Sequence, residues 1–217
     1  MVVRVTYRPL PLLPENFGTR EGCFKIKGKP AVYLYHAYKF SGDVEEGMTE
    51  VRESVKKGTS SDLFLIGNTV TWKYTDDESN VHDVWPRPYD AITGPFDTTY
   101  GHEGDKFPGS IEDNEGSLRR LHSEWSSYAH SFGIHFIPTA MPGFASIRPK
   151  DKDLTVLPKS TKRFAEQLKV CMDFLDDEIR HLFAISWNDD EESDGIEPTV
   201  QEGYKYLQTL RDTIASE

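Results

Sequence analysis

Apolar residues occur in two patterns along this chain, short runs and longer stripes. The segments 63–66 (LFLI) and 182–185 (LFAI) are wholly apolar, which predicts buried strands because no polar face remains. Residues 31–36, 89–93 and 134–138 are similar short β-type segments. Between them, apolar residues recur every three or four positions, which predicts amphipathic helices. These stripes cover residues 44–55, 118–132, 164–179 and 200–214.

Residues typical of helix ends flank several of these stripes. Ser160 or Thr161 is expected to cap the third helix, because a hydroxyl there accepts a bond from an unpaired backbone N–H group. Thr199 and Glu202 have the spacing of a capping box and are expected to start the last helix. Gly58 is expected to end the first helix.

Strands and helices therefore alternate, which predicts a parallel α/β sheet with right-handed crossovers. About five strands are too few for a closed eight-stranded barrel, which usually takes about 250 residues. The chain is thus either a small open sheet or the C-terminal part of a barrel. Residues 1–24 contain three prolines and are expected to form an irregular leader before one domain at residues 25–217.

Composition narrows the classes of partner. The 217-residue chain carries a net charge of −11, which argues against a nucleic-acid backbone as partner. The sequence contains no apolar stretch near the roughly 20 residues of a membrane span and no signal-peptide pattern, so a cytoplasmic protein is the default expectation. A secretory or periplasmic location stays open. Cys23 and Cys171 fit no metal or redox spacing; free thiols are the simpler interpretation, and one disulfide is possible.

An acidic loop follows the last predicted strand. In parallel α/β folds the loops at the carboxyl ends of the strands usually carry the chemistry. Crowded carboxylates repel each other, and separated pKa values are what a general acid and a general base require. A solvated charged loop is the plain alternative, and a calcium loop would need a D-x-D-x-D-G pattern that is missing. The acids considered are Asp189, Asp190, Glu191, Glu192 and Glu197.

Several segments resemble motifs of the endo-α-mannosidase group, glycoside hydrolase family 99 and its bacterial relatives. Residues 28–35 (GKPAVYLY) resemble the family's GK-x-apolar-Y-I-Y, and residues 136–144 with 146–149 (FIPTAMPGF, SIRP) resemble F-I-P-S-x-x-P-G-Y and S-I-R-P. Residues 186–197 (SWNDDEESDGIE) resemble S-[WF]-N-E-W-H-E-G-T-Q-I-E without a gap, and residues 204–207 (YKYL) resemble Y-x-Y-L. The acidic loop also resembles the W-N-D-x-G-E-S loop of family 71 α-1,3-glucanases.

The resemblance implies a (β/α)₈ barrel, of which these strands are the last five, and action on α-linked mannose or a related sugar without metal or cofactor. Asp189 stands at the family's base position and Glu192 at its acid position, with an internal sugar epoxide as intermediate. Glu197 matches the motif's trailing Glu, which would hold the sugar or its neighbours, and Arg148 matches the S-I-R-P arginine, as a substrate clamp or as a salt-bridge partner of the acidic loop. Further expected substrate contacts are Asn188, Trp187, Phe144, Tyr100 and Trp72.

This sequence departs from the family at three points. The base is one methylene shorter, the aromatic residue between the two acids is Asp190, and the N-terminal third of the barrel has no counterpart. A glycosidase is therefore the favoured function. The alternatives are a degenerate relative that binds carbohydrate without turnover, and an accessory protein of polysaccharide sugar transfer. Exposed sheet edges would call for a partner chain or a homodimer.

Overall fold

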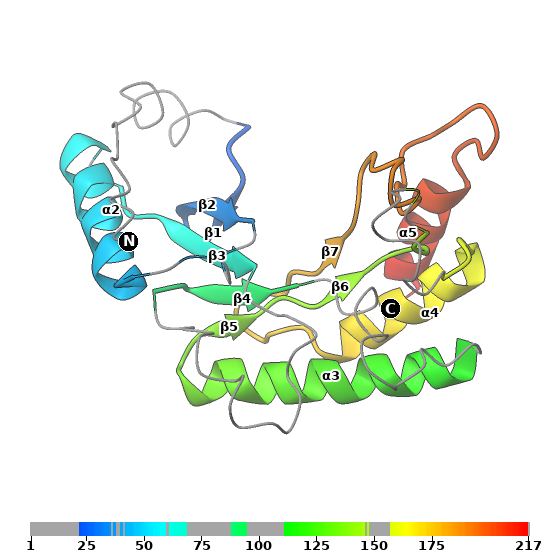
Figure 1. Ribbon diagram of the computed structural model, residues 1–217, viewed down its shortest axis with the longest axis horizontal. Coiled ribbons are helices and arrows are strands. Elements are labelled where there is room, and N and C mark those ends of the chain that lie inside the picture. Colours follow the sequence, from blue (N-terminus) through cyan, green and yellow to red (C-terminus); the bar gives the residue numbers. More distant parts are fainter. Residues whose placement is uncertain are drawn as a thin grey trace.

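The computed structural model describes residues 22–35, 37, 40, 42–59, 61–68, 88–94, 111–145, 147 and 157–216. In this part of the chain, mostly parallel strands form a curled sheet with helices along its outer side (Figure 1). The predicted parallel α/β arrangement is confirmed. The division into a leader at 1–24 and a domain at 25–217 stays a prediction, since most of the leader lies outside the described residues.

Two sets of paired strands make up the curl. In the first set β2 (Lys29–Leu34), β3 (Phe64–Asn68), β4 (Ala91–Thr93) and β5 (His135–Phe136) lie parallel and in chain order. In the second set β6 (Thr139–Ala140) pairs in parallel with β7 (Phe183–Ala184). Of the predicted strand at 134–138, only β5 is paired as a strand, and β6 follows where a loop was expected. This second short strand pairs with β7.

A short hairpin precedes the parallel strands. Strand β1 (Lys25–Ile26) pairs antiparallel with the start of β2. Its turn residues Lys27 and Gly28 have φ of 51° and 76°, the left-handed pair that a tight two-residue hairpin requires. The hairpin places Ile26 under the inner face of the sheet, where the residue is fully buried.

The two faces of the sheet have separate apolar cores, because side chains alternate along each strand. On the outer face, Val32, Leu65 and Phe136 pack against Leu118 and Trp125 of the helix that follows β4. The inner face has a second core, formed by Ile26, Phe64, Ile66, Ala91, Ile137 and Ile179, with Ala31 and Phe183 beside them. The inside of the curl, toward the amino-terminal ends of the strands, is therefore filled by these side chains.

Four helices are described, and several of their ends differ from the sequence predictions. They are α2 (Val44–Thr59), α3 (Ile111–Ser131), α4 (Thr161–Asp173) and α5 (Lys205–Ala215). Helix α2 continues through Gly58, so the predicted stop there is wrong. Helix α4 ends six residues early, because the Asp176 carboxylate accepts bonds from the N–H groups of Glu178 and Ile179 and forms a separate turn. Ser160 caps α4 as predicted, accepting a bond from the Arg163 N–H group.

The start of the last helix was predicted too early. The Thr199 hydroxyl does accept a bond from the Glu202 N–H group, at 3.0 Å, as the capping box predicts. However, Gly203 has φ of 58°, a left-handed conformation that ends the turn, and α5 begins only at Lys205. Val200 therefore lies exposed in a turn and not on a helix face.

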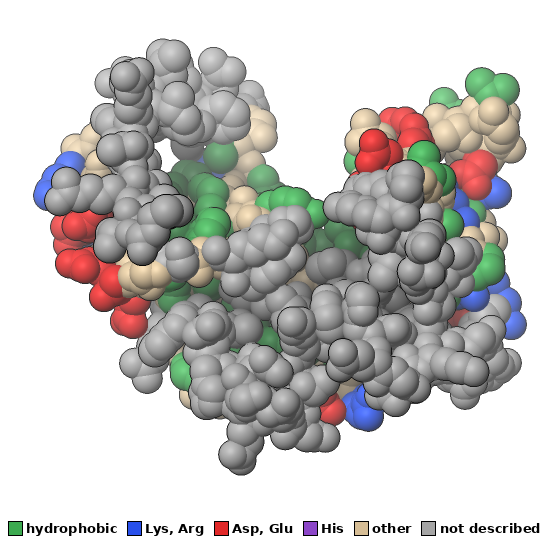
Figure 2. Space-filling model, viewed as in Figure 1, with side chains coloured by type: hydrophobic (Ala, Val, Ile, Leu, Met, Phe, Trp, Pro, Cys, Tyr) green, Lys and Arg blue, Asp and Glu red, His purple; other side chains and the backbone are tan. Residues whose placement is uncertain are grey.

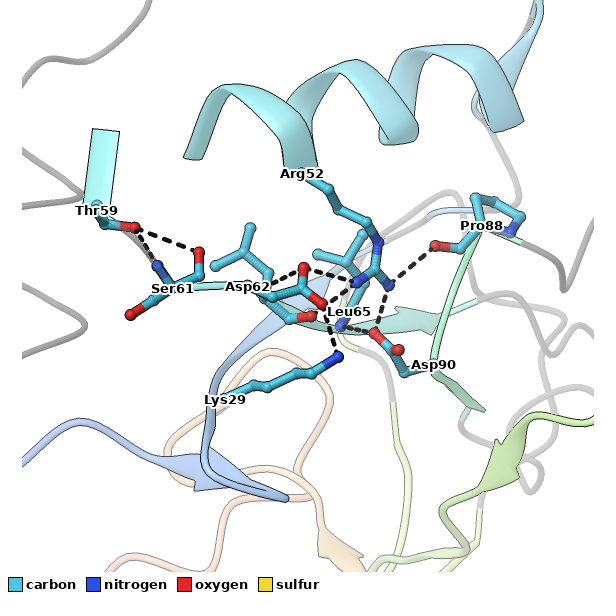
Figure 3. Close-up of polar contacts among 9 residues, drawn as sticks. Lys29, Arg52, Thr59, Ser61, Asp62, Leu65, Pro88 and Asp90 are labelled. Atoms are coloured by element: carbon cyan, nitrogen blue, oxygen red, sulfur yellow. Dashed lines mark hydrogen bonds and ion pairs between the residues drawn. The ribbon is translucent and has the colours of Figure 1, made fainter. Parts of the chain in front are cut away.

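Ion pairs join α2 to the amino-terminal ends of β3 and β4 (Figure 3). The Arg52 guanidinium donates to the Leu63 carbonyl at 2.8 Å and pairs with Asp62 and Asp90. Asp90 also accepts a bond from the Leu65 N–H group at 2.7 Å, and Lys29 pairs with Asp62 at 2.6 Å. This end of the sheet is thus held by charged side chains.

Candidate active site

The acidic loop, residues 185–197, leaves the carboxyl end of β7. The loop after β6 runs beside it, and two backbone bonds join them: the Ala145 N–H group donates to the Glu192 carbonyl at 2.8 Å, and the Ile147 N–H group donates to the Glu191 carbonyl at 3.0 Å. The loops from two adjacent strands therefore form one unit. This is the end of a parallel sheet at which active sites are usually found.

Hydrogen bonds inside the acidic loop fix its course. The Ser186 hydroxyl donates to the Asp194 carboxylate at 2.5 Å and accepts a bond from the Asp189 N–H group at 2.8 Å. The Asp189 carboxylate in turn accepts a bond from the Glu192 N–H group at 3.1 Å. The positions of both predicted catalytic residues thus depend on one chain of contacts that begins at Asp194.

Backbone contacts close the base of this loop. The N–H groups of Ile196 and Glu197 both donate to the Trp187 carbonyl, at 3.0 and 2.8 Å. A Cβ on Gly195 would lie 3.3 Å from the Asn188 Cα and from the Trp187 carbonyl oxygen, so glycine permits the close approach. The loop is consequently a folded structure and not a loose solvated chain.

The predicted base and the backbone of the predicted acid are in contact in the structure. Asp189 and Glu192 are both half-buried and lie one turn apart, joined by the bond just described. Glu197 is half-buried and Asn188 exposed. Trp187 is 54% exposed, so its indole is not a core residue and is accessible to a ligand.

Other predicted contacts lie elsewhere. Phe144 is only 4% exposed and packs with Met141, Leu157 and Ile185, which leaves little of its ring for a sugar. Phe144 therefore packs between the loop after β6 and the start of the acidic loop. Arg148, Tyr100 and Trp72 lie outside the described residues.

Asp194 is an acid of this loop that the sequence prediction did not single out. Its side chain is buried, with 4% exposure. Burial raises the pKa of Asp194 above its ordinary value, and the nearby Asp189 carboxylate adds to this, while the bond from Ser186 and the charge of Lys159 oppose it. The one signal in the sequence is that Asp194 directly precedes a glycine and an apolar residue, Gly195 and Ile196.

The described residues contain neither a group of three or more His, Cys, Asp or Glu side chains able to hold a metal ion nor a helix long and apolar enough to cross a bilayer. The carboxylates of the acidic loop can hold or move a proton and can accept bonds from hydroxyl groups.

Comparison with known proteins relates this fold to glycoside hydrolases. No protein-family model matches the sequence, and no curated protein matches it. A solved structure described as a glycoside hydrolase-like protein matches with a TM-score of 0.74 at 16% identity, over 90% of this chain and 57% of its own. The family 99 endo-α-mannosidase from Bacteroides thetaiotaomicron matches with a TM-score of 0.60 at 17% identity, over 93% of this chain and 57% of the enzyme.

A second structure of that endo-α-mannosidase, in complex with BIS-TRIS-propane, matches with a TM-score of 0.61 at 17% identity and covers 94% of this chain and 64% of the enzyme. The chain thus spans less than two thirds of the length of these structures. At such low identity the likeness establishes the fold. The chain has the fold of a partial (β/α) barrel similar to that of these glycoside hydrolases, and its span fits the C-terminal part of their barrel.

Proposed function

We propose that this protein is a glycoside hydrolase that acts on α-linked mannose or a related sugar in a glycan or polysaccharide. The observation that carries the proposal is that Asp189 and Glu192 lie one turn apart on one folded loop at the carboxyl end of the sheet, joined through the Glu192 N–H group. Two carboxylates in complementary roles are what glycoside hydrolysis generally requires. The fold shared with glycoside hydrolases supports the same conclusion.

In the proposed reaction Glu192 is the proton donor and Asp189 the base. Asp189 takes a proton from a neighbouring sugar hydroxyl, whose oxygen forms a bond to the anomeric carbon as the glycosidic bond breaks. Glu192 gives its proton to the departing oxygen. Water then opens the internal epoxide at the anomeric carbon: Glu192 takes a proton from the water, and Asp189 returns its proton to the sugar oxygen. Glu197, Asn188 and Trp187 hold the sugar.

Turnover of α-mannoside and α-glucoside oligosaccharides tests this proposal. We expect Glu192→Gln and Asp189→Asn each to lower the rate by about a hundredfold or more, because general acid–base catalysis contributes at least about this much. Asp190→Asn is the matched control, since Asp190 is an exposed neighbour in the same loop. Equal rates in all three variants would contradict the proposed roles.

A second candidate is a relative that binds carbohydrate without turnover. The specific observation in its favour is that Asp189, one methylene shorter than the family's base, already uses a carboxylate oxygen to hold the Glu192 N–H group. A shift of about 1 Å in a catalytic group can cost about a hundredfold in rate. Saturable glycan binding with no turnover by the wild type would favour this candidate.

A further inference from the structure

Two exposed tyrosines stand on the inner face of the curled sheet. Tyr33 lies in β2 and Tyr35 directly follows it; Tyr33 is 43% exposed and Tyr35 67% exposed. Residues two apart on a strand point to the same face, and Ala31 before them packs in the inner core. Their rings are roughly parallel, with centroids 6.5 Å apart and an interplanar angle of 28°. They form a pair, called here the tyrosine platform.

The platform is supported from two sides. The Tyr33 ring contacts the Phe183 ring of β7 edge-on, with 5.8 Å between the centroids. This contact joins β2 to β7 across the inside of the curl. Asn68, buried at the end of β3, is in hydrogen-bond contact with the Tyr33 phenol. Burial and the neighbouring Tyr35 raise the pKa of Tyr33 to about 12 despite that bond, so the phenol is uncharged at neutral pH.

The platform and the acidic loop belong to opposite sides of one hollow. Figure 1 places β2 on one side of the curl and the segment that follows β7 on the other. Figure 2 shows an open depression between these two sides, with hydrophobic side chains at its base. A ligand in this depression lies between the strand that carries the tyrosine platform and the loop that carries the carboxylates.

We propose that the tyrosine platform binds further sugar units of the same glycan whose reacting bond lies at the acidic loop, an inference that rests on the proposed function. Aromatic rings with an exposed face pack against the C–H faces of pyranose rings, and their phenol groups exchange hydrogen bonds with sugar hydroxyls. The carboxylates opposite repel anionic chains. The structure therefore favours an uncharged oligosaccharide or polysaccharide long enough to reach both walls.

Binding of α-mannosyl ligands of increasing length to the full chain tests the platform, independently of turnover. The ligands are a methyl mannoside, a disaccharide and a tetrasaccharide, with affinity measured by calorimetry. We expect Tyr35→Ala to weaken tetrasaccharide binding by about fivefold to tenfold, in line with the loss of one aromatic contact, and to leave the methyl mannoside unaffected. Tyr35→Phe keeps the ring and should retain most of the affinity.

Tyr204→Ala is the matched control, because Tyr204 is 65% exposed, nearly as much as Tyr35, but stands before α5. Equal binding of the tetrasaccharide by the two alanine variants would overturn the platform, as would wild-type affinity that does not grow with ligand length. If the tyrosine platform is instead a protein interface, Tyr35→Ala will abolish self-association and leave glycan binding unchanged. That result too would overturn the proposal. If length-dependent binding is lost in Tyr35→Ala while Glu192→Gln changes no turnover, the platform stands and the catalytic proposal fails.

Discussion

Two buried aspartates at opposite ends of the sheet differ in the sign of their pKa shifts. Asp176 lies at the amino-terminal end, beside the first residue of β5, and its pKa is lowered to about 2. Asp194 lies in the acidic loop at the carboxyl end, and its pKa is raised. Both side chains are largely hidden from water, so burial alone cannot explain the difference.

The difference arises from what surrounds each carboxylate. Burial by itself would raise the pKa of Asp176, but bonds from His135 at 2.9 Å, from two backbone N–H groups and from His130 at 3.2 Å outweigh it. Asp194 has the Ser186 hydroxyl as its side-chain donor and another carboxylate, Asp189, nearby. The amino-terminal end of the sheet thus stabilises the ionised form of its buried aspartate, and the carboxyl end disfavours it. This agrees with the proposal that the carboxyl end carries the chemistry, because functional sites often retain destabilising groups.

The largest effect is expected at the amino-terminal end. Asp176→Asn should lower the free energy of unfolding by roughly 2 kcal/mol at neutral pH, because several donors lose a charged acceptor. Asp173→Asn is the control, since Asp173 forms an exposed ion pair with Arg119 and should lose less than about 0.5 kcal/mol. Urea unfolding of both variants measures the difference.

The pH dependence of that effect has a definite sign. An aspartate whose folded pKa is about 2, below its unfolded value of about 3.9, stabilises the fold fully above the unfolded value. This stabilisation is lost as the pH falls toward about 2. The wild type and Asp176→Asn should therefore converge in stability across that window. A stability difference between the two proteins that stays constant down to about pH 2 would contradict the lowered pKa of Asp176.

A smaller loss is expected from the hydroxyl that supports the acidic loop. Ser186→Ala removes the donor to Asp194 and the acceptor of the Asp189 N–H group, which should cost about 1–2 kcal/mol. Ser131→Ala is the control, because its hydroxyl bonds the Tyr128 carbonyl on the surface. Hydrogen exchange at the Asp189 amide should accelerate only in Ser186→Ala, and unchanged protection there would contradict the proposed chain of contacts.

The location of the acidic loop was predictable from sequence, but its internal structure was not. An apolar run followed by acids is a local pattern, and β7 with its loop appears where that pattern predicted. The burial of Asp194 depends on Ser186, eight residues away, and on Lys159, which belongs to another loop. Contacts of this kind leave no periodic signal in a sequence.

The tyrosine platform was missed for a related reason. Residues 31–36 fit a buried strand, and Val32 and Leu34 do pack under the outer helices. Tyr33 and Tyr35 instead face the open side of a curl, and the curvature of a sheet follows from how distant strands pair. The same limit applies to β6, which was predicted as a loop: it pairs with the distant β7, whereas β5, two residues before it, pairs with β4.

A third variant tests the charge near Asp194. The Lys159 ammonium pairs with Glu202 at 2.7 Å, lies 4.5 Å from the centre of the Tyr206 ring, and lowers the pKa of Asp194. Lys159→Met should cost about 1 kcal/mol in stability and move the Asp194 pKa further upward. Lys205→Met is the matched control, because Lys205 contacts the same Glu202 and Tyr206 from a more exposed position. NMR titration of the Asp194 carboxyl group distinguishes the two variants. Equal titration curves in both would contradict the effect of the Lys159 charge on the pKa of Asp194.

The smallest effect on stability, and the one of opposite sign, is expected for Asp194→Asn. An asparagine oxygen can still accept the Ser186 bond, but the charge that burial opposes is removed. For an acid with a raised folded pKa, the ionised form weakens the fold above that pKa, and the penalty disappears as the pH falls toward the unfolded value of about 3.9. Asp194→Asn should therefore equal the wild type or exceed it by up to about 1 kcal/mol at pH 7, and the gain should shrink on acidification. Asp190→Asn, exposed in the same loop, should leave the stability at pH 7 unchanged. If Asp194→Asn instead loses stability as Asp176→Asn does, both ends of the sheet stabilise an ionised buried aspartate, and the contrast between them is wrong.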